Sequence, residues 1–531
     1  MPSITLSGLA ASTPDGRTLF SDIDLSFDGG RTGLVGRNGV GKTTLLRMIA
    51  GMLVPQAGTV SANGTVGLLR QTVQVAPDET LADLMGAADA LALLRRADEG
   101  RATADELASA DWTLEARLAS ALGRVGLDAT PAALLSTLSG GQRTRAALAA
   151  LILAEPDFIL LDEPTNHLDR EGRAAVIDLL ATWRSGAIVV SHDRELLETM
   201  DAIVELTSLG ATRYGGNWSH YRARKALDLA AARHDLADAE RRVVEVERAT
   251  QATAERKARK DTAGQRKRAK GDMPRILAGA RQSRAESTSG DQARLAERRR
   301  AEAIEDATAA RQRIEVLQPF SVALPSTGLP QGRTVLRVEG VSAGYGAGNA
   351  IIDRLTFAMA GPERVALTGP NGSGKTTLLS LIAGKLAPRS GNVSTTRAFA
   401  LLDQQVSLLD PALSIRDNFL KLNPGSDENA CRAALARFMF RADAALQRVG
   451  TLSGGQMLRA GLACVLGGPK PPELVILDEP TNHLDVDAIE AVEAGLRAYD
   501  GALLVVSHDE TFLASVGITR RIELPPARRS R

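Results

Sequence analysis

The chain repeats one ordered set of short motifs, and this repeat constrains the fold more than any other feature. The first copy contains GRNGVGKTT (36–44), LSGGQ (138–142) and LLDEPTNHLD (160–169), and the second contains GPNGSGKTT (369–377), LSGGQ (452–456) and VILDEPTNHLD (475–485). The spacing repeats as well, because 29 positions separate Lys42 from Gln71 and also Lys375 from Gln404. A repeat this long predicts two homologous domains.

The two copies differ in one stretch. From Gln71 to Ser139 the chain advances 68 positions, but from Gln404 to Ser453 it advances only 49, so the first copy holds a 19-residue insertion. The run LADLMGAADALALLRR in this stretch is typical of a helix. We therefore expect a short helical arm within about residues 76–135.

A segment of different composition separates the copies. Between residues 222 and 318, Ala, Arg, Lys and Glu dominate, which favours helix. Leu229, Leu236 and Val243 recur every seven residues, and a second set at helical spacing follows: Ala307, Ala310, Ile314 and Leu317. Because Gly271 and Pro274 interrupt the pattern, we expect an antiparallel helical hairpin. The predicted domains are 1–221, the linker 222–318, and 319–531.

Composition fits a soluble globular chain, with 44% hydrophobic and 24% charged residues. No stretch reaches the roughly 18–20 apolar residues that a membrane span requires. The start, MPSITLSGLAASTPDG, lacks the basic and apolar regions of a secretion signal, which predicts a cytoplasmic protein. Cys431 and Cys464 lie in apolar stretches, so we interpret them as packing residues rather than a disulfide.

Both copies carry the pattern G-x-x-x-x-G-K-[ST] after a β-like run and before a helix. Glycines let backbone N–H groups surround phosphates, the lysine reaches the β- and γ-phosphates, and the threonine offers a hydroxyl to Mg²⁺. The predicted ATP ligands in the two loops are Gly36, Arg37, Asn38, Gly39, Val40, Gly41, Lys42, Thr43 and Thr44, and Gly369, Pro370, Asn371, Gly372, Ser373, Gly374, Lys375, Thr376 and Thr377, with Thr43 and Thr376 also as Mg²⁺ ligands.

Two acidic residues follow an apolar run in each copy, as FILLDE and LVILDE. This pattern places a carboxylate at the carboxyl end of a buried parallel strand, so Asp162 and Asp478 are predicted Mg²⁺ ligands. Glu163 and Glu479 are the predicted catalytic carboxylates that orient or deprotonate the attacking water. The predicted γ-phosphate contacts are His192 and His508, each 30 positions after the aspartate of its copy.

The LSGGQ runs predict a second anion site, built from a serine, glycine N–H groups and a helix N-terminus. The residues are Ser139, Gly140, Gly141 and Gln142, and Ser453, Gly454, Gly455 and Gln456. One domain cannot easily point both this element and its phosphate loop at one nucleotide. We therefore expect the two domains to face each other head to tail and to share two ATP molecules.

These motifs, in this order, resemble the ATP-binding cassette superfamily over some 430 of 531 positions. The resemblance implies a Mg²⁺-dependent ATP hydrolase with ATP and Mg²⁺ as cofactors. It gives Gln71 and Gln404 the role of ATP and Mg²⁺ ligands, and Asp169 and Asp485 that of the loop facing the other domain. It also implies that Tyr345 stacks on adenine, whereas Thr13 occupies the matching position of the first copy.

Two cassettes in one chain, the helical linker and the run DEPTNHLD in both cassettes resemble the ABC-F proteins, as does YGGNWSHY at 214–221. The fold class expected is α/β, with two P-loop cassettes joined by a long helical hairpin. The resemblance implies a monomer that binds the ribosome in an ATP-dependent manner, near ribosomal RNA and peptidyl-tRNA, and that modulates translation or protects ribosomes from antibiotics.

Two alternatives remain open at this point. The chain could be the ATP-binding subunit of a transporter with separate membrane partners, although such a subunit has no need of a basic linker. It could also be a DNA-associated ATPase, which the short ELPPARRSR end disfavours.

The linker carries a concentrated positive charge. Residues 256–284 hold eleven Lys or Arg against two acids, a local charge of +9 in a chain of +1. Such a cluster is typical of contacts with phosphate backbones, although a solvated helix face would look similar. The predicted RNA-binding residues are Arg256, Lys257, Arg259, Lys260, Arg266, Lys267, Arg268, Lys270 and Arg275. The resemblance to the ABC-F proteins implies that residues 271–280 form the tip of the linker.

Overall fold

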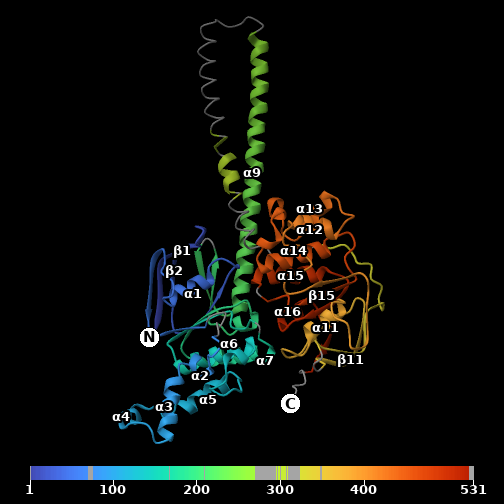
Figure 1. Cartoon of the computed structure of the whole chain (residues 1–531). Helices are drawn as coiled ribbons and strands as arrows, with labels where there is room; N and C mark the ends of the chain where they lie inside the picture. Colours follow the sequence, from blue (N-terminus) through green and yellow to red (C-terminus); the bar gives the residue numbers. More distant parts are fainter. Residues whose placement is uncertain are drawn as a thin grey trace. The chain divides into compact units, whose positions relative to one another are not determined.

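The computed structural model separates the chain into two compact units, residues 1–219 with 320–531, and residues 220–319. The structure describes residues 2–69, 76–166, 168–207, 210–268, 295, 297–298, 300–306, 308, 323–346, 350–482 and 484–525. The first unit holds both cassettes and the second holds the helical linker (Figure 1).

The first cassette is built on two sheets. The smaller is antiparallel, in the order β2 (Thr18–Phe27), β1 (Ser3–Ser12), β4 (Ala57–Asn63). The larger has the order β5 (Val66–Leu69), β6 (Phe158–Asp162), β7 (Gly186–Val190), β3 (Arg31–Val35), β8 (Ala202–Thr207), β9 (Gly210–Gly215). Its strands are parallel except for β9. The apolar runs of β6 and β7 are buried on both faces, as a parallel sheet requires.

Eight α-helices accompany these sheets among the described residues of the first cassette: α1 (Lys42–Ile49), α2 (Leu81–Leu84), α3 (Ala88–Asp98), α4 (Ala104–Ser109), α5 (Leu114–Arg124), α6 (Gly140–Ala154), α7 (Arg170–Thr182) and α8 (Arg194–Leu197). Thr80 and Thr103 start α2 and α4 with capping boxes, in which each threonine and an acidic residue three positions later satisfy each other's N–H groups. Helices α2 to α5 lie in the stretch where the sequence places the arm.

The second cassette repeats this plan. Its antiparallel sheet has the order β11 (Ile352–Ala360), β10 (Thr334–Ala343), β13 (Ser390–Thr395), and its parallel sheet the order β14 (Phe399–Leu402), β15 (Leu474–Asp478), β16 (Ala502–Val506), β12 (Arg364–Thr368), β17 (Arg520–Glu523). The α-helices are α11 (Lys375–Ile382), α12 (Ile415–Leu422), α13 (Glu428–Arg437), α14 (Gly454–Leu466), α15 (Val486–Ala498) and α16 (Glu510–Ser515).

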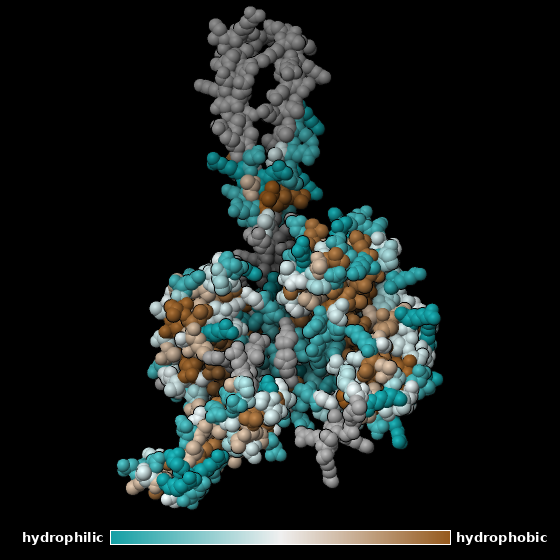
Figure 2. All heavy atoms as spheres, viewed as in Figure 1, coloured by the Kyte–Doolittle hydropathy of each residue, from teal (hydrophilic) through white to brown (hydrophobic). Residues whose placement is uncertain are grey.

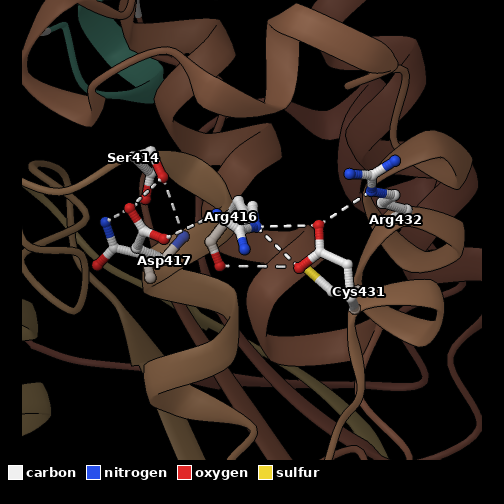
Figure 3. Close-up of polar contacts among 7 residues, drawn as sticks. Ser414, Arg416, Asp417, Cys431 and Arg432 are labelled. Carbon is white, nitrogen blue, oxygen red and sulfur yellow. Dashed lines mark hydrogen bonds and ion pairs between the residues drawn. The ribbon is translucent and has the colours of Figure 1, made fainter.

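Polar side chains join α12 to α13 (Figure 3). The Arg416 Nε donates to both carboxylate oxygens of Glu428, at 2.9 and 3.0 Å, and Arg432 donates to the same carboxylate at 2.9 Å. Cys431 and Cys464 are buried in the hydrophobic core of this cassette and carry free thiols, which confirms that they pack the core. Burial raises the pKa of the Cys431 thiol to about 11, so it stays protonated.

The linker begins with α9 (Trp218–Arg268), a helix of 51 residues. Leu229, Leu236 and Val243 are half-buried, whereas Ala232 and Ala239 between them are buried. These positions are spaced alternately three and four residues apart, which is typical of the face along which two helices pack. A second helical segment follows within 295–308, and Arg300 there forms an ion pair of 3.1 Å with Glu247 on α9.

On the face drawn in Figure 2, the coloured part of the linker is mostly hydrophilic, with one hydrophobic group among the hydrophilic atoms. The set Ala307, Ala310, Ile314 and Leu317 lies outside the described residues, as does the expected tip at 271–280. The α/β fold class with two cassettes and a helical linker is confirmed. Among the described residues, no helix combines the length and apolarity needed to cross a membrane.

A glycine in β7 offers a test of the core. A Cβ at Gly186 would overlap the ring of Phe158, which is 1% exposed. We expect Gly186→Ala to lower the free energy of unfolding by about 1–3 kcal/mol, because the parallel sheet cannot move away from the ring. Gly123→Ala on α5 is the control, since a Cβ there meets open space and alanine favours helix. Thermal unfolding followed by circular dichroism measures both; an equal midpoint for the two variants would contradict this account.

Candidate active site

The two phosphate loops lie between the carboxyl end of a central strand and a helix, β3 and α1 in the first cassette, β12 and α11 in the second. Gly41 and Gly374 precede the helices with φ of 106° and 96°, a left-handed conformation that other residues rarely adopt. A Cβ at Gly41 would also come within 2.8 Å of the ring of Phe20. The loop backbone therefore depends on the glycines that the motif contains.

The lysine of each loop is folded back onto its own loop. The Lys42 ammonium donates to the carbonyls of Gly36 at 2.6 Å and Arg37 at 3.1 Å, and Lys375 does the same to Gly369 and Pro370 at 2.8 and 3.2 Å. Both lysines are buried, and desolvation lowers their pKa against the opposing effect of nearby carboxylates. A buried cation at the N-terminus of a helix is suited to bind phosphate oxygens.

Mg²⁺ fits the oxygen donors beside each lysine. The Asp162 carboxylate ends β6 and accepts a hydrogen bond from the Thr43 hydroxyl, while burial raises its pKa. Asp478 ends β15, and burial likewise raises its pKa. No group of three or more His, Cys, Asp or Glu gathers as a metal site in the described ranges. One carboxylate and one hydroxyl are what Mg²⁺ uses when phosphates and water complete its shell.

The glutamate after each aspartate lies against a histidine. His192 Nε2 is 3.2 Å from a Glu163 carboxylate oxygen, and His508 Nε2 is 3.5 Å from that of Glu479. Burial raises the pKa of Glu163 to about 8 and of Glu479 to about 7. Burial also lowers the pKa of His508 to about 4 and that of His192 well below its usual value. The structure thus brings together the predicted base and the predicted γ-phosphate contact in both cassettes.

The backbone of these glutamates is strained. Glu163 has φ of 51° and Glu479 has φ of 47°, in the left-handed region. Their N–H groups donate to the carbonyls of Val190 and Val506 at 2.9 Å, which anchors each turn to the neighbouring strand. Such conformations cost about 1–3 kcal/mol and occur mainly at functional sites.

Each LSGGQ run begins a helix through a capping box. Ser139 Oγ accepts from the Gln142 N–H at 3.3 Å, and Gln142 Oε1 accepts from the Ser139 N–H at 2.9 Å. The same pair of bonds joins Ser453 and Gln456, at 3.3 and 3.0 Å. Gly140 and Gly141, like Gly454 and Gly455, form the first turns of α6 and α14. Their N–H groups are the donors that an anion at this helix end would use.

Contacts across the first unit join the two cassettes. Asp485 Oδ2 accepts a hydrogen bond from the backbone N–H of Asn38 at 2.8 Å, while its Oδ1 caps α15. Asp485 and Asp162 both act electrostatically on Lys42, and Asp169 acts on Lys375. Arg459 on α14 lies close enough to Arg37 for their charges to interact. The phosphate loop of each cassette therefore lies beside the Asp169 or Asp485 loop of the other.

Three charged residues near these sites were not predicted from the sequence. The first, Asp487, forms an ion pair of 3.1 Å with Arg37, and the second, Asp403, acts electrostatically on Asp478. Asp487 lies two residues after the predicted Asp485, and Asp403 precedes Gln404, but the resemblance assigns neither a role. The third, Arg173 on α7, acts electrostatically on both Glu479 and His508.

The remaining predicted residues are less well placed. Gln71 lies outside the described residues, and Gln404 is an exposed residue in the turn after β14. Tyr345 is 58% exposed after β10, and the matching Thr13 hydrogen-bonds Arg17 across a turn. In the linker, Arg256 and Arg259 are exposed. The other predicted RNA-binding residues within α9 are Lys257, Lys260, Arg266, Lys267 and Arg268, the last three in its final turns. Lys270 and Arg275 fall outside the described residues.

Comparison with known proteins gives consistent matches for both halves. The family described as "ABC transporter" matches residues 20–166 and 352–482. The tylosin resistance ATP-binding protein TlrC of Streptomyces fradiae is 34% identical over 93% of this chain and 92% of its own. The energy-dependent translational throttle protein EttA is 32% identical, in Mycobacterium tuberculosis over 94% of this chain and 87% of its own, and in Escherichia coli K12 over 96% and 90%.

Among solved structures, the archaeal ribosome recycling factor aABCE1, in complex with a ribosomal stalk protein, matches with a TM-score of 0.55. The match covers 98% of this chain and 90% of that chain at 17% identity. An RNase-L inhibitor structure matches with the same TM-score and identity. At this identity the likeness concerns the fold alone.

The contact between Asp485 and Asn38 can be tested separately from its capping role. We expect Asp485→Ala to lower ATP turnover roughly tenfold or more, because the phosphate loop loses an acceptor supplied by the other cassette. Asp427→Ala is the matched control, since Asp427 caps α13 through the Ala430 N–H at 2.7 Å within its own cassette. Both variants should lose about 0.5–2 kcal/mol of stability. Equal ATP turnover in the two would contradict a role for Asp485 in the site.

Proposed function

Because the chain belongs to the ABC-F group of ATP-binding cassette proteins, we propose that it hydrolyses ATP at two sites and binds the ribosome when ATP is bound. The two cassettes close around two ATP molecules and set the linker against ribosomal RNA and peptidyl-tRNA. Hydrolysis reopens the cassettes and releases the ribosome. The effect on the cell is modulation of translation, and protection of the ribosome from an antibiotic is one form that it takes.

The observation that carries this proposal is the close approach of a largely buried glutamate and a largely buried histidine in both cassettes, at 3.2 and 3.5 Å. Each pair lies beside a phosphate-loop lysine that acts on the glutamate electrostatically. The glutamate orients or deprotonates the attacking water, and the neutral histidine contacts the γ-phosphate. Two such complete sets support two hydrolytic sites rather than one hydrolytic and one silent site.

Mg²⁺ would be held by Thr43 and Asp162 in one site and by Thr376 and Asp478 in the other. When bound, it neutralises charge that develops on the transferred phosphoryl group. Gln71 and Gln404 would reach the same cation, and Tyr345 would stack on the adenine of the second site. Lys42 and Lys375 bind the phosphates, and the Ser139 and Ser453 helix ends bind the γ-phosphate from the opposite cassette.

Two observations support the ribosome as the proposed partner. The names of TlrC and EttA describe tylosin resistance and translational throttling, and both proteins match this chain over nearly its whole length. The linker sequence adds a local charge of +9 within residues 256–284. Arg256 and Arg259, on the described part of α9, are exposed. Positive charge without interleaved aromatics suits the phosphate backbone of structured RNA.

Sedimentation with ribosomes tests this function. The variant Glu163→Gln with Glu479→Gln should bind ATP yet lose about 10²-fold or more of its turnover, since each site lacks its base. It should then pellet with ribosomes only when ATP is present, because hydrolysis no longer releases it. The matched control is Glu115→Gln with Glu339→Gln, two exposed glutamates, one on each cassette. Unchanged turnover in the first variant, or no pelleting with ATP, would overturn the proposal.

The linker charge predicts the salt dependence of that binding. We expect Arg256, Lys257, Arg259 and Lys260, replaced together by Gln, to weaken ribosome binding and to make it less sensitive to salt. Fewer counterions would be released from the RNA, so the slope of log affinity against log salt should fall by about three to four. Arg233→Gln with Arg242→Gln is the control, because both residues are exposed on the same helix outside the cluster. Equal slopes for the two variants would place the contact elsewhere.

A further inference from the structure

The contact between the cassettes contains a buried ion pair that the two ATP sites do not use. Arg194, the first residue of α8, donates from Nη1 to Glu493 Oε1 on α15 at 2.8 Å. Their side chains are 12% and 5% exposed. The Nε and Nη2 atoms of Arg194 are buried without a hydrogen-bond partner, so the bond from Nη1 to Glu493 is the contact that compensates this buried charge. Removing Glu493 would leave the charge unpartnered, which is strongly destabilising.

A second arginine lies close to the same place. Arg173 on α7 forms an ion pair of 2.7 Å with Asp193, the residue after His192. It also lines a cavity of about 40 Å³ together with Asp509, the residue after His508 in the other cassette. Burial alone would lower the pKa of Arg173, but Asp193 and Asp509 together raise it. Arg173 therefore carries its charge between the aspartates that follow the two site histidines.

These charges do not follow the internal repeat. An offset of 316 residues relates Asp162 to Asp478 and His192 to His508. The same offset relates Arg173 to Ile489, and Arg194 to Glu510. It also relates Ile177 to Glu493, so neither buried arginine has a basic counterpart in the second cassette.

A second ion pair between the cassettes, which is exposed, has its charges arranged in the same way. Arg37 of the first cassette pairs with Asp487 of the second at 3.1 Å, and Pro370 replaces the arginine in the second phosphate loop. In both of these ion pairs the first cassette supplies the cation and the second supplies the anion. A symmetric pair of first cassettes would set Arg194 against Ile177, leaving a buried charge without a partner.

We propose that Arg194 and Glu493, supported by Arg173, form a polarised latch that holds the first cassette specifically against the second. The latch positions the chain segments that carry His192 and His508, since Asp193 and Arg194 are the two residues after His192 and Asp509 follows His508. It contains no residue of the phosphate loops. Opening and closing of the cassettes therefore has an electrostatic component that ATP does not provide.

Charge reversal tests the latch in the full chain. Fluorescent dyes are attached to cysteines introduced at Ser61 and Ser394, which are exposed on β4 and β13, whereas the two native cysteines are buried. Energy transfer between the dyes is followed as ATP is added. We expect Arg194→Glu alone and Glu493→Arg alone to need roughly tenfold more ATP, or to stop short of the plateau. The double variant, Arg194→Glu with Glu493→Arg, should restore the unsubstituted response.

An ion pair within the second cassette provides the matched control. Arg416 on α12 donates from Nε to the two carboxylate oxygens of Glu428 on α13, at 2.9 and 3.0 Å. Reversing Arg416 alone, or both partners, should leave the energy transfer unchanged. If charge reversal of the buried residues prevents folding, as circular dichroism would show, Arg194→Gln and Glu493→Gln replace them, and each is expected to weaken closure.

Two results would overturn the latch: single variants that respond like the unsubstituted chain, or a double variant that is no better than the singles. If the unsubstituted chain shows no response to ATP, the proposed ATP-driven closure is wrong. The latch is then judged from the nucleotide-free energy transfer of the same four proteins. Lower transfer in the singles and recovery in the double would support it, and equal transfer would reject it.

Discussion

The removal of charged groups from water at the carboxyl edge of each parallel sheet is the constraint on which the rest of the structure depends. Strands β3, β6 and β7, and β12, β15 and β16, end at this edge, and their buried apolar residues hold it in place. The lysines that begin α1 and α11 and the aspartates that end β6 and β15 are buried at this edge, and the glutamates that follow the aspartates are largely buried. Desolvation lowers the pKa of the lysines and raises that of the carboxylates, so each group needs a partner of the opposite sign.

A ligand with both anionic oxygens and a metal ion meets that need. Phosphates offer partners to the lysine and to the helix N-termini, while a divalent cation offers one to the aspartate. Under the proposed function, each site takes further partners from the LSGGQ helix and the Asp169 or Asp485 loop of the other cassette. Closing of the cassettes would complete the partners of these buried groups. Binding, closure and chemistry would then depend on one set of desolvated charges.

The sequence predicted those parts of the fold and site that a short motif encodes. The strand, loop and helix around Lys42 and Lys375 are where the glycine pattern places them, because only glycine permits that backbone. The pairing of Glu163 with His192 required the strand order, in which β6 lies beside β7, and periodicity does not give strand order. Arg173 and Arg194 could not be predicted for another reason. The residues at the matching positions of the second cassette are Ile489 and Glu510, so the internal repeat does not single out either arginine.

The left-handed backbone of Glu163 and Glu479 has a consequence for how such a protein changes over time. Glycine would have lower backbone strain than glutamate at both positions, because it has no Cβ and adopts positive φ readily. A lineage selected only for a stable fold would gain by losing these carboxylates, and it would keep a cassette that binds nucleotide without hydrolysing it. The fold therefore gives up stability at both positions, in each half of the chain, to hold a carboxylate beside a phosphate loop.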